Sequence, residues 1–369
     1  MRKILIVGGM RRGGGITEFI ITNYSKIETE ELNFDFVNTI GLTDYEEYIK
    51  SKKWGLFYIR PLKKGPLKHY LDWYSFLKRN HKKYKAIHFH NESLHNFLPI
   101  IMAKLFRIEN IIVHAHNTYN LKTGKFKHFF HKVGKKCVSR VGDYFFACSM
   151  NAGRFFFSKK AIKNDKVEVI NNGIEIERFA FIEQERERIR ASFNLRHQIV
   201  IGHVGRFEYQ KNHEFIIEVF YEFHQYNQSS ILMLVGMGPD EEKIKEKVKN
   251  LNLEKNVLFL GIRKDVNKIM EAMDVLLFPS IFEGLGIVLI EAQATGLPCL
   301  VSDIIAEEAL CSPKIQTLSL ALSAKEWAKK IQVLVTDDTE RKNQHGLLRE
   351  KGYSSNEVSM RLNDFYINL

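Results

Sequence analysis

The chain has 369 residues, 45% of them hydrophobic, which suits two globular domains with cores of their own. No run of about 18 apolar residues occurs, so the sequence predicts no membrane-spanning helix. The formal net charge is +12, and the two halves differ: residues 1–170 hold 31 Lys and Arg against 14 Asp and Glu, whereas residues 171–369 hold 24 against 29. The first half is therefore expected to face an anionic partner, unless its charge serves only solubility.

Short β-branched and aromatic runs alternate with longer helical patterns along the whole chain. The expected strands of the first half are 3-KILIV, 34-FDFVN, 56-LFYIR, 85-KAIHFH, 110-NIIVHA, 143-DYFFAC and 167-VEVI. Those of the second half are 198-QIVIGHVG, 231-ILMLVG, 256-NVLFLG, 274-DVLLF and 298-PCLVS. This alternation predicts an α/β protein with two doubly wound, Rossmann-like parallel sheets, covered by helices on both faces.

The turn residues of 171-NNGIEIERF predict a domain boundary, giving domains over 1–172 and 173–354. The final helical pattern, 355–369, has no following strand and could pack back on the first domain. Because ligands bind at the carboxyl ends of parallel strands, two such domains are expected to hold a ligand between them. The four cysteines show no C-x-x-C or zinc spacing and are expected to be reduced and mostly buried, which indicates the cytoplasm.

A glycine-rich loop, 7-VGGMRRGGGITEF, joins the first strand to a helical pattern. Gly13, Gly14 and Gly15 leave their backbone N–H groups open to a phosphate or a sugar. The spacing fits neither G-x-G-x-x-G nor the P-loop, so a dinucleotide or Walker-type site is disfavoured. A flexible turn is the alternative.

A second strand-to-helix junction, 204-VGRFEYQKNHEF, carries two cations. Arg206 follows the strand, and Lys211 is expected to open the helix five residues later. Both can point at one anion, and a diphosphate fits the planar fork of Arg beside the point charge of Lys. Two ordinary surface cations are the alternative.

Two carboxylates mark the stretch 279-PSIFEGLGIVLIEAQATGLPCLVSD. Glu283 falls in a loop with Gly284 and Gly286, and Glu291 lies about one turn into the following helix, inside an apolar run. A carboxylate there needs hydrogen-bond donors, and sugar hydroxyls are suitable ones. A loop glutamate and a salt-bridged helix glutamate are the alternative.

Taken together, these motifs resemble the retaining family-4 glycosyltransferases of the GT-B fold, in the capsule and exopolysaccharide branch. The resemblance covers nearly the whole chain. It rests on the two glutamates with Arg206 and Lys211, on the glycine loop, and on 113-VHAHN, 146-FACS, 170-INNGIE, 235-VGMGPDEE, 260-LGIRKDV, 302-SD and 317-TLSLALSAKEWAKKI. It implies two Rossmann-like domains facing each other across a cleft.

The resemblance also implies roles for single residues. Arg206 and Lys211 would bind the donor diphosphate, Glu283 would hold the donor sugar and Glu291 the ribose. The remaining donor-binding positions would be Gly14, Gly15, Gly261, Ile262, Arg263, Gly284, Leu285, Gly286 and Ile287. His116 would be the active-site histidine near the reacting sugar, whereas His88, His90 and His114 are expected to be structural.

The implied activity is transfer of a hexose or N-acetylhexosamine, with retention, from a nucleotide sugar to a lipid-linked saccharide. UDP is the expected nucleotide. Neither a cofactor nor a metal is expected, because the chain has no D-x-D and the cations can neutralise a diphosphate. Two alternatives stay open: an inactive membrane-binding partner subunit, and a nucleotide-sugar epimerase or hydrolase.

The segment 121-LKTGKFKHFFHKVGKKCVSRV predicts an amphipathic helix. Together with the basic stretch 60–85 it is typical of a surface that binds anionic lipid, so a peripheral position on the inner face of the cell membrane is expected. The face consists of Lys125, Phe126, Lys127, Phe129, Phe130, Lys132, Lys135 and Lys136. An ordinary core helix with a solvated basic side is the alternative, and no nucleic-acid motif accompanies the segment.

Overall fold

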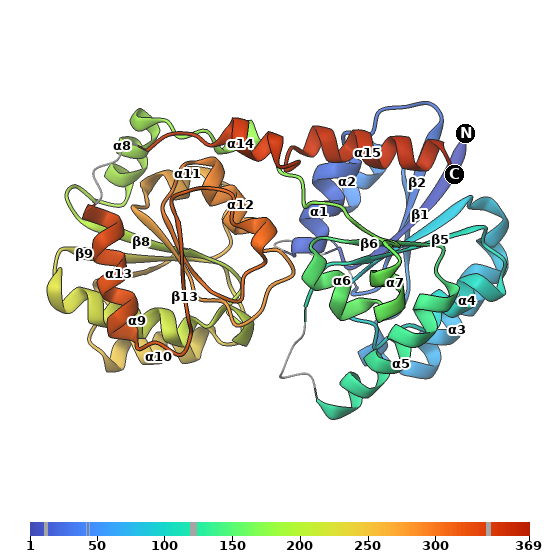
Figure 1. The fold of residues 1–369 in the computed structure, drawn as a ribbon, viewed down its shortest axis with the longest axis horizontal. Helices are drawn as coiled ribbons and strands as arrows, with labels where there is room; N and C mark the ends of the chain where they lie inside the picture. The colour runs from blue at the N-terminus through green and yellow to red at the C-terminus, as the bar shows by residue number, and fades with distance from the viewer. Residues whose placement is uncertain (11–13, 42, 44, 119–123, 337–340) are drawn as a thin grey trace. The chain divides into compact units, whose positions relative to one another are not determined.

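The computed structural model describes residues 1–10, 14–41, 43, 45–118, 124–336 and 341–369. The chain forms two compact units, Met1–Gly173 with Ser355–Leu369, and Ile174–Ser354. Each unit is a parallel sheet flanked by helices (Figure 1).

The first unit is built on a seven-stranded parallel sheet of order β3-β2-β1-β4-β5-β6-β7. Its strands are β1 (Arg2–Gly8), β2 (Leu32–Asn38), β3 (Gly55–Tyr58), β4 (Ala86–Asn91), β5 (Asn110–Ala115), β6 (Tyr144–Ala147) and β7 (Val167–Val169). The strand order reverses between β1 and β4, and this is where ligands bind in doubly wound sheets.

Helices α1 (Gly15–Tyr24) and α15 (Ser355–Ile367) share one hydrophobic core with this sheet. Val358, Leu362 and Tyr366 recur every fourth residue of α15, so one buried stripe faces the core. The last helix therefore belongs to the first unit, although it is far from α1 in sequence.

The sheet's opposite side is covered at β4 by α3 (Pro66–Asn80), whose Trp73 contacts Phe89. Side chains alternate along a strand, so Phe89 points away from the face that carries His88 and His90. Helices α4 (Leu98–Leu105) and α5 (Lys125–Val141) continue this layer. The shorter helices are α2 (Glu46–Ser51), α6 (Met150–Phe156) and α7 (Lys159–Lys163).

The second unit has a six-stranded parallel sheet of order β10-β9-β8-β11-β12-β13, which reverses between β8 and β11. Its strands are β8 (Ile199–Val204), β9 (Ser230–Val235), β10 (Val257–Phe259), β11 (Val275–Phe278), β12 (Cys299–Ser302) and β13 (Ile315–Leu318). Its helices are α8 (Glu183–Ser192), α9 (His213–Tyr226), α10 (Glu241–Asn250), α11 (Val266–Ala272), α12 (Ile287–Ala294), α13 (Ala324–Thr336) and α14 (His345–Glu350). Phe207, Phe220 and Trp327 are fully buried in its core.

The strands expected from the sequence all form, and β13 is an additional one. The helix expected to open at Lys211 begins at His213 instead. Asn212 adopts a left-handed conformation (φ +56°), which ends a short 3-10 helix, η4 (Tyr209–Lys211), before α9 starts.

Within the described residues, no helix has the length and apolar character needed to cross a bilayer. The four cysteines are free; Cys148 and Cys299 are buried, and Cys137 and Cys311 are half-buried.

Candidate functional site

The loops that follow β8 and β11 meet at the reversal point of the second sheet. The Ile281 amide donates to the Gln210 carbonyl at 2.8 Å. The Asn212 side-chain amide donates to the Pro279 carbonyl at 3.2 Å. The two loops are thus joined by their own hydrogen bonds, at the place where an open α/β sheet receives a ligand.

Lys211 and Glu283 lie at this junction and form an ion pair. Lys211 Nζ is 2.6 Å from Glu283 Oε1, and the side chains are only 15% and 6% exposed. Gln210 Nε2 donates to Glu283 Oε2 at 3.0 Å. Lys211 Nζ also lies 4.6 Å from the centre of the Phe278 ring, a cation–π distance. The sequence predicts Lys211 and Glu283 as site residues, whereas Gln210 and Phe278 were not anticipated.

Glycines let the loops after β8 and β9 come into contact beside this pair. Gly236 has a φ of +132°, and a Cβ there would lie 2.1 Å from the Gly205 carbonyl oxygen. A Cβ at Gly238 would lie 2.2 Å from the Phe207 carbonyl oxygen. Only glycine fits at these positions, so the motifs around 205 and 236 fix the shape of the sheet edge.

Arg206 is placed less tightly than Lys211. Its guanidinium lies 3.7 Å from Glu208, and both side chains are more than a third exposed. An exposed pair of this kind contributes little to stability. The guanidinium is therefore available to an anion at the end of β8.

The predicted loop 284–287 leads into α12. Gly286 precedes the helix in a left-handed conformation (φ +85°). Leu285 is buried, so only its backbone can face a ligand. Glu291 is half-buried in the second turn of α12.

The predicted donor-binding residues 261–263 follow β10. Gly261 is left-handed (φ +64°) with open space where a Cβ would stand. Ile262 is 52% exposed. The Arg263 guanidinium forms two hydrogen bonds with Asp265, at 2.9 and 2.8 Å, so that charge already has a partner.

The remaining predicted site residues belong to the first unit. Gly14 caps α1 and Gly15 opens it, with open space beside the Gly15 backbone; Gly13 lies outside the described residues. His116 follows β5 and is half-buried. Its Nε2 lies 2.8 Å from Nδ1 of His90. Burial lowers the pKa of His116 to about 3, so the ring is neutral near pH 7.

Helix α5 shows which of its faces is free. Its buried residues are His131, Gly134 and Val138, whereas Phe126 and Phe129 are 75% and 61% exposed. Phe130 is half-buried, so Phe126 and Phe129 are the predicted rings that lie outside the helix's core side. Lys125, Lys127, Lys132 and Lys136 are exposed.

Lys135 departs from the prediction that all five lysines share one free surface. Its Nζ donates to the backbone carbonyls of Arg154 and Phe155. Because the ammonium is partly buried against α6, its pKa is lowered. The free basic face therefore consists of the other four lysines.

Two doubly wound units in one chain, with a cation–carboxylate pair at the reversal point of the second sheet, define the GT-B class of glycosyltransferases. Residues 41–178 match the family described as Glycosyltransferase Family 4, and residues 185–347 match Glycosyl transferases group 1. The protein named EpsF in Bacillus subtilis (strain 168) is 32% identical over 336 residues, covering 89% of this chain and 86% of that one. The chain thus belongs to the GT-B glycosyltransferases, in their exopolysaccharide branch, and is a transferase.

Other similar proteins are also glycosyltransferases or share the fold. An Escherichia coli UDP-Gal:α-D-GlcNAc-diphosphoundecaprenol α-1,3-galactosyltransferase is 28% identical over 283 residues, covering 74% of this chain and 71% of its own. An amylovoran biosynthesis glycosyltransferase, AmsD of Erwinia amylovora, is 26% identical over 208 residues, covering 55% and 54%. The crystal structure of Anabaena Alr3699/HepE with UDP and glucose superposes with a TM-score of 0.82 at 17% identity, covering 100% of both chains. That last similarity supports the fold.

Proposed function

We propose that this glycosyltransferase moves a hexose or N-acetylhexosamine from a UDP-sugar to a lipid-linked saccharide, with retention and without a metal, in capsule or exopolysaccharide assembly. The observation that carries the proposal is the buried Lys211–Glu283 pair with Gln210 at the reversal point of the second sheet. This cradle offers a cation for a phosphate and a carboxylate for sugar hydroxyls.

The cradle suits the departure of a nucleoside diphosphate. As the bond between the sugar's anomeric carbon and the phosphate oxygen breaks, negative charge grows on the phosphate and positive charge on the sugar. Lys211, with Arg206 at the end of β8, stabilises the first, and Glu283 accepts hydrogen bonds from the sugar. The acceptor oxygen then bonds to the anomeric carbon on the same face and gives its proton to the departing phosphate oxygen, so the step balances and the configuration is retained.

UDP as the nucleotide is supported by two similar proteins. The galactosyltransferase that resembles this chain is named for a UDP-Gal donor, and the HepE structures hold UDP or UDP-glucose. The galactosyltransferase's diphosphoundecaprenol substrate likewise supports a lipid-linked acceptor.

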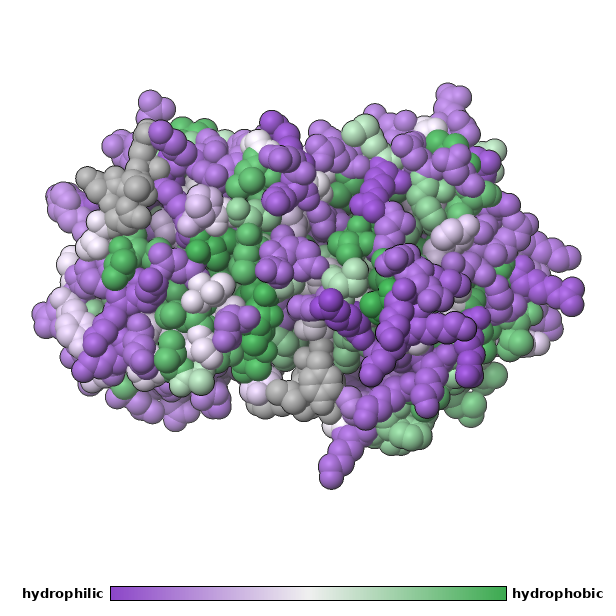
Figure 2. Space-filling view, in the orientation of Figure 1, coloured by the Kyte–Doolittle hydropathy of each residue, from purple (hydrophilic) through white to green (hydrophobic). Residues whose placement is uncertain are grey.

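The exposed apolar and basic side chains of the first unit support an acceptor held at a membrane. Leu67, Leu71 and Tyr74 of α3, at i, i+4 and i+7, are exposed beside the α4 and α5 layer. Figure 2 shows hydrophobic patches among long hydrophilic side chains on the part of the molecule that carries these helices. Exposed aromatic and aliphatic groups interleaved with lysines fit an anionic lipid surface. We therefore propose peripheral binding at the inner face of the cell membrane.

The proposal is tested by a thermal-shift and turnover panel of UDP-, GDP- and dTDP-sugars, with and without EDTA. Stabilisation by UDP-sugars alone, unchanged by EDTA, is expected, together with slow acceptor-free hydrolysis of the sugar that is transferred. Stabilisation only by another nucleotide family would overturn the donor assignment. Full turnover without an acceptor would indicate an epimerase or hydrolase, and binding with no transfer to any lipid-linked acceptor would indicate an inactive subunit.

A further inference from the structure

Four histidines line the core of the first unit on one side of its sheet. His88 and His90 alternate along β4, and His114 and His116 alternate along and just beyond β5. His90 is paired with His114 in the register of the two strands. All four rings therefore point to the same face, where Phe19 and Tyr24 of α1 and Tyr366 of α15 cover them.

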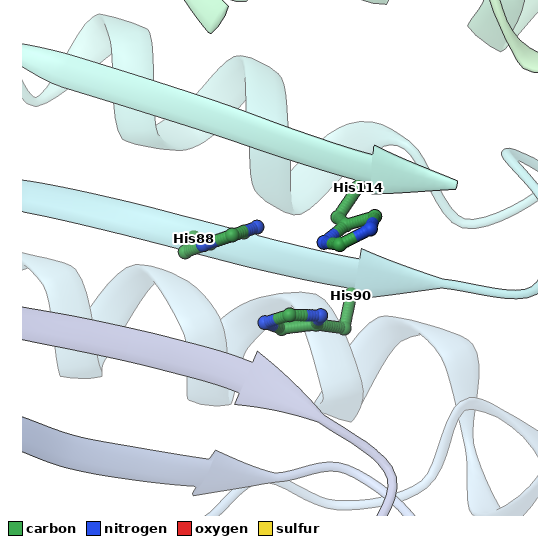
Figure 3. Close-up of side chains that lie close together, drawn as sticks. All are labelled: His88, His90 and His114. Atoms are coloured by element: carbon green, nitrogen blue, oxygen red, sulfur yellow. The ribbon is translucent and has the colours of Figure 1, made fainter. Parts of the chain in front are cut away.

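Three of these rings bring nitrogens close enough together to suggest a metal site. One ring nitrogen from each of His88, His90 and His114 lies within 4.8 Å of the others, and all three residues are buried. The rings nevertheless stack: the His88 and His90 planes differ by 18° with centroids 4.2 Å apart, and those of His88 and His114 also differ by 18°. Nitrogen lone pairs lie in the ring plane, so stacked rings do not aim them at one ion about 2 Å away (Figure 3).

Hydrogen bonds link the rings into a chain instead. Tyr366 Oη lies 2.5 Å from His88 Nδ1 and 2.7 Å from Tyr24 Oη. Tyr24 Oη lies 3.1 Å from His90 Nε2 and 3.1 Å from His88 Nδ1, and His90 Nδ1 lies 2.8 Å from His116 Nε2. The chain thus runs from the middle of the core to the predicted active-site histidine.

Donation can run along this chain in two directions, because each neutral imidazole has one donor and one acceptor nitrogen. The contact between Tyr24 Oη and His88 Nδ1 offers a second route for either direction, and His88 Nδ1 donates in the first and accepts in the second. The first runs from His88 Nδ1–H to Tyr366, on to Tyr24 and to His90 Nε2, after which His90 Nδ1–H donates to His116. The second reverses every bond and puts a proton on His88 Nε2. That nitrogen is buried and has no partner among the described residues. A buried N–H without an acceptor is rarer and more costly than an unused acceptor, so the first direction is favoured.

We propose that the Tyr366–Tyr24–His90 chain is a positioning device that fixes His116 as the Nδ1–H tautomer. His116 then presents an N–H donor, not a basic nitrogen, toward an oxygen of its ligand. Nδ1 is the ring atom left for this role, since Nε2 is occupied by His90. His114, whose ring nitrogens have no partner within the described residues, stacks on His116 at 4.1 Å and restrains its ring plane.

Burial supports a neutral chain. It lowers the pKa values of His88, His90 and His114 well below the usual histidine value. It also raises the pKa values of Tyr24 and Tyr366. No proton is therefore gained or lost along the chain near pH 7, and each hydrogen stays where its bond places it.

The test is direct observation of the tautomer. Two-bond ¹H–¹⁵N correlation spectra of histidine-labelled protein at pH 7.5 distinguish protonated from unprotonated ring nitrogens, and His116→Gln identifies the His116 signals by their loss. We expect a protonated Nδ1 and an unprotonated Nε2 in His116. A protonated Nε2 would overturn the proposal. This readout needs no sugar donor or acceptor, so it succeeds or fails separately from the proposed function.

Two variants test the source of the tautomer. Tyr24→Phe removes the hydroxyl that donates to His90 but keeps the ring, so His116 should show both tautomers. Tyr366→Phe with His88→Leu removes both groups that can donate to Tyr24, since Tyr24 Oη lies 2.7 Å from Tyr366 Oη and 3.1 Å from His88 Nδ1, and this double variant serves if Tyr24→Phe does not fold. Tyr84→Phe is the matched control, because its buried hydroxyl bonds to Asp35 instead. An unchanged His116 spectrum in the folded variants would overturn the proposal.

Two further readouts separate positioning from mere structure. The part assigned to His116 in transfer rests on the proposed function: with a working donor, Tyr24→Phe should lower kcat by about tenfold with little change in the donor KM, as a lost orientation does. The alternative metal site is probed with added Zn²⁺ followed by dialysis and elemental analysis. One retained zinc per chain, with loss of the His90 and His88 signals, would overturn the proposed Tyr366–Tyr24–His90 hydrogen-bond chain.

Discussion

Lys211 Nζ and Glu283 Oε1 lie 2.6 Å apart at the joined ends of the β8 and β11 loops, and both side chains are nearly buried. The two residues are 72 positions apart in the chain and meet because β8 and β11 are neighbours in the sheet. The lysine ammonium pairs with this carboxylate. A bound diphosphate would compete for the lysine while the carboxylate turns to the sugar.

Lys211→Ala and Glu283→Ala should each lower transfer by at least about a hundredfold, since each removes a group that stabilises charge at the reacting centre. Each also leaves a buried charge with a lost partner, so the free energy of unfolding should fall by about 3 kcal/mol. Steady-state kinetics and urea unfolding measure the two effects.

The double variant and an exposed pair serve as controls. Lys211→Ala with Glu283→Ala should lose less stability than the sum of the single variants, because no unpaired charge remains. Lys243→Ala, which breaks an exposed pair with Glu214, should change neither property appreciably. Near-wild-type turnover in both single site variants would contradict the assignment of the site.

Gln210→Ala tests the residue that holds the other carboxylate oxygen. Losing the 3.0 Å bond to Glu283 Oε2 frees that side chain to turn, so the donor Kd should rise by about tenfold while the fold persists. Gln210→Glu should be worse, because it sets two carboxylates side by side. Isothermal titration with UDP-sugar measures both; equal affinity in Gln210→Glu and wild type would show that Glu283 is held by other groups.

Gly236→Ala should be strongly destabilising. A Cβ would stand 2.1 Å from the Gly205 carbonyl oxygen, so the loop after β8 must move, at a loss on the order of 3 kcal/mol. Gly65→Ala is the matched control, because Gly65 has nearly the same φ, +135°, with no atom nearer than 3.9 Å. It should lose only about 1 kcal/mol, from backbone strain alone. Chemical unfolding measures both losses of stability. Similar losses in Gly236→Ala and Gly65→Ala would mean that the structure relaxes around the added Cβ at Gly236.

Much of this fold could be predicted because hydrophobic runs of strand length alternate with helical patterns. The sequence does not predict strand β13, because IQTL is short and partly exposed. The start of α9 was misplaced because helical propensity at Lys211 gives no sign of the left-handed Asn212. Local patterns predict the existence of elements better than their ends.

The candidate site could be predicted in part. Lys211 and Glu283 were expected to serve one ligand, but their direct contact and the support from Gln210 depend on the register of two strands distant in sequence. The histidine chain carried a usable signal: H-x-H on β4 and H-x-H at β5 put four rings on one face once the strands are adjacent. Tyr24 and Tyr366, 342 positions apart, could not be connected to it without the position of α15.

His114→Leu should make the protein less sensitive to acid. The pKa of His114 is held well below the unfolded value of about 6.5, so unfolding takes up a proton below that pH. Above about pH 6.5 the titration of His114 does not reduce the free energy of unfolding. As the pH falls from there toward the folded pKa, this free energy decreases. Removing His114 should flatten the fall by up to about 1.4 kcal/mol per pH unit below the unfolded pKa of about 6.5.

Urea unfolding at a series of pH values measures this slope for wild type and His114→Leu. His197→Gln is the control, since His197 is exposed and its replacement should leave the slope unchanged. An equal slope in His114→Leu and wild type would mean that His114 is already protonated in the folded state.

Membrane binding should depend on the free basic face of α5 and on its exposed rings. Replacing Lys125, Lys127, Lys132 and Lys136 by Gln should weaken binding to phosphatidylglycerol vesicles by roughly 1 kcal/mol per charge at low salt. Phe126→Ser with Phe129→Ser should weaken it at every salt concentration, because burial of apolar rings is not screened. A matched control replaces Lys243, Lys249, Lys255 and Lys325, exposed lysines of the second unit. Equal loss in this control would show that net charge, not the α5 surface, drives binding, whereas unchanged binding in both lysine variants would place the lipid contact elsewhere.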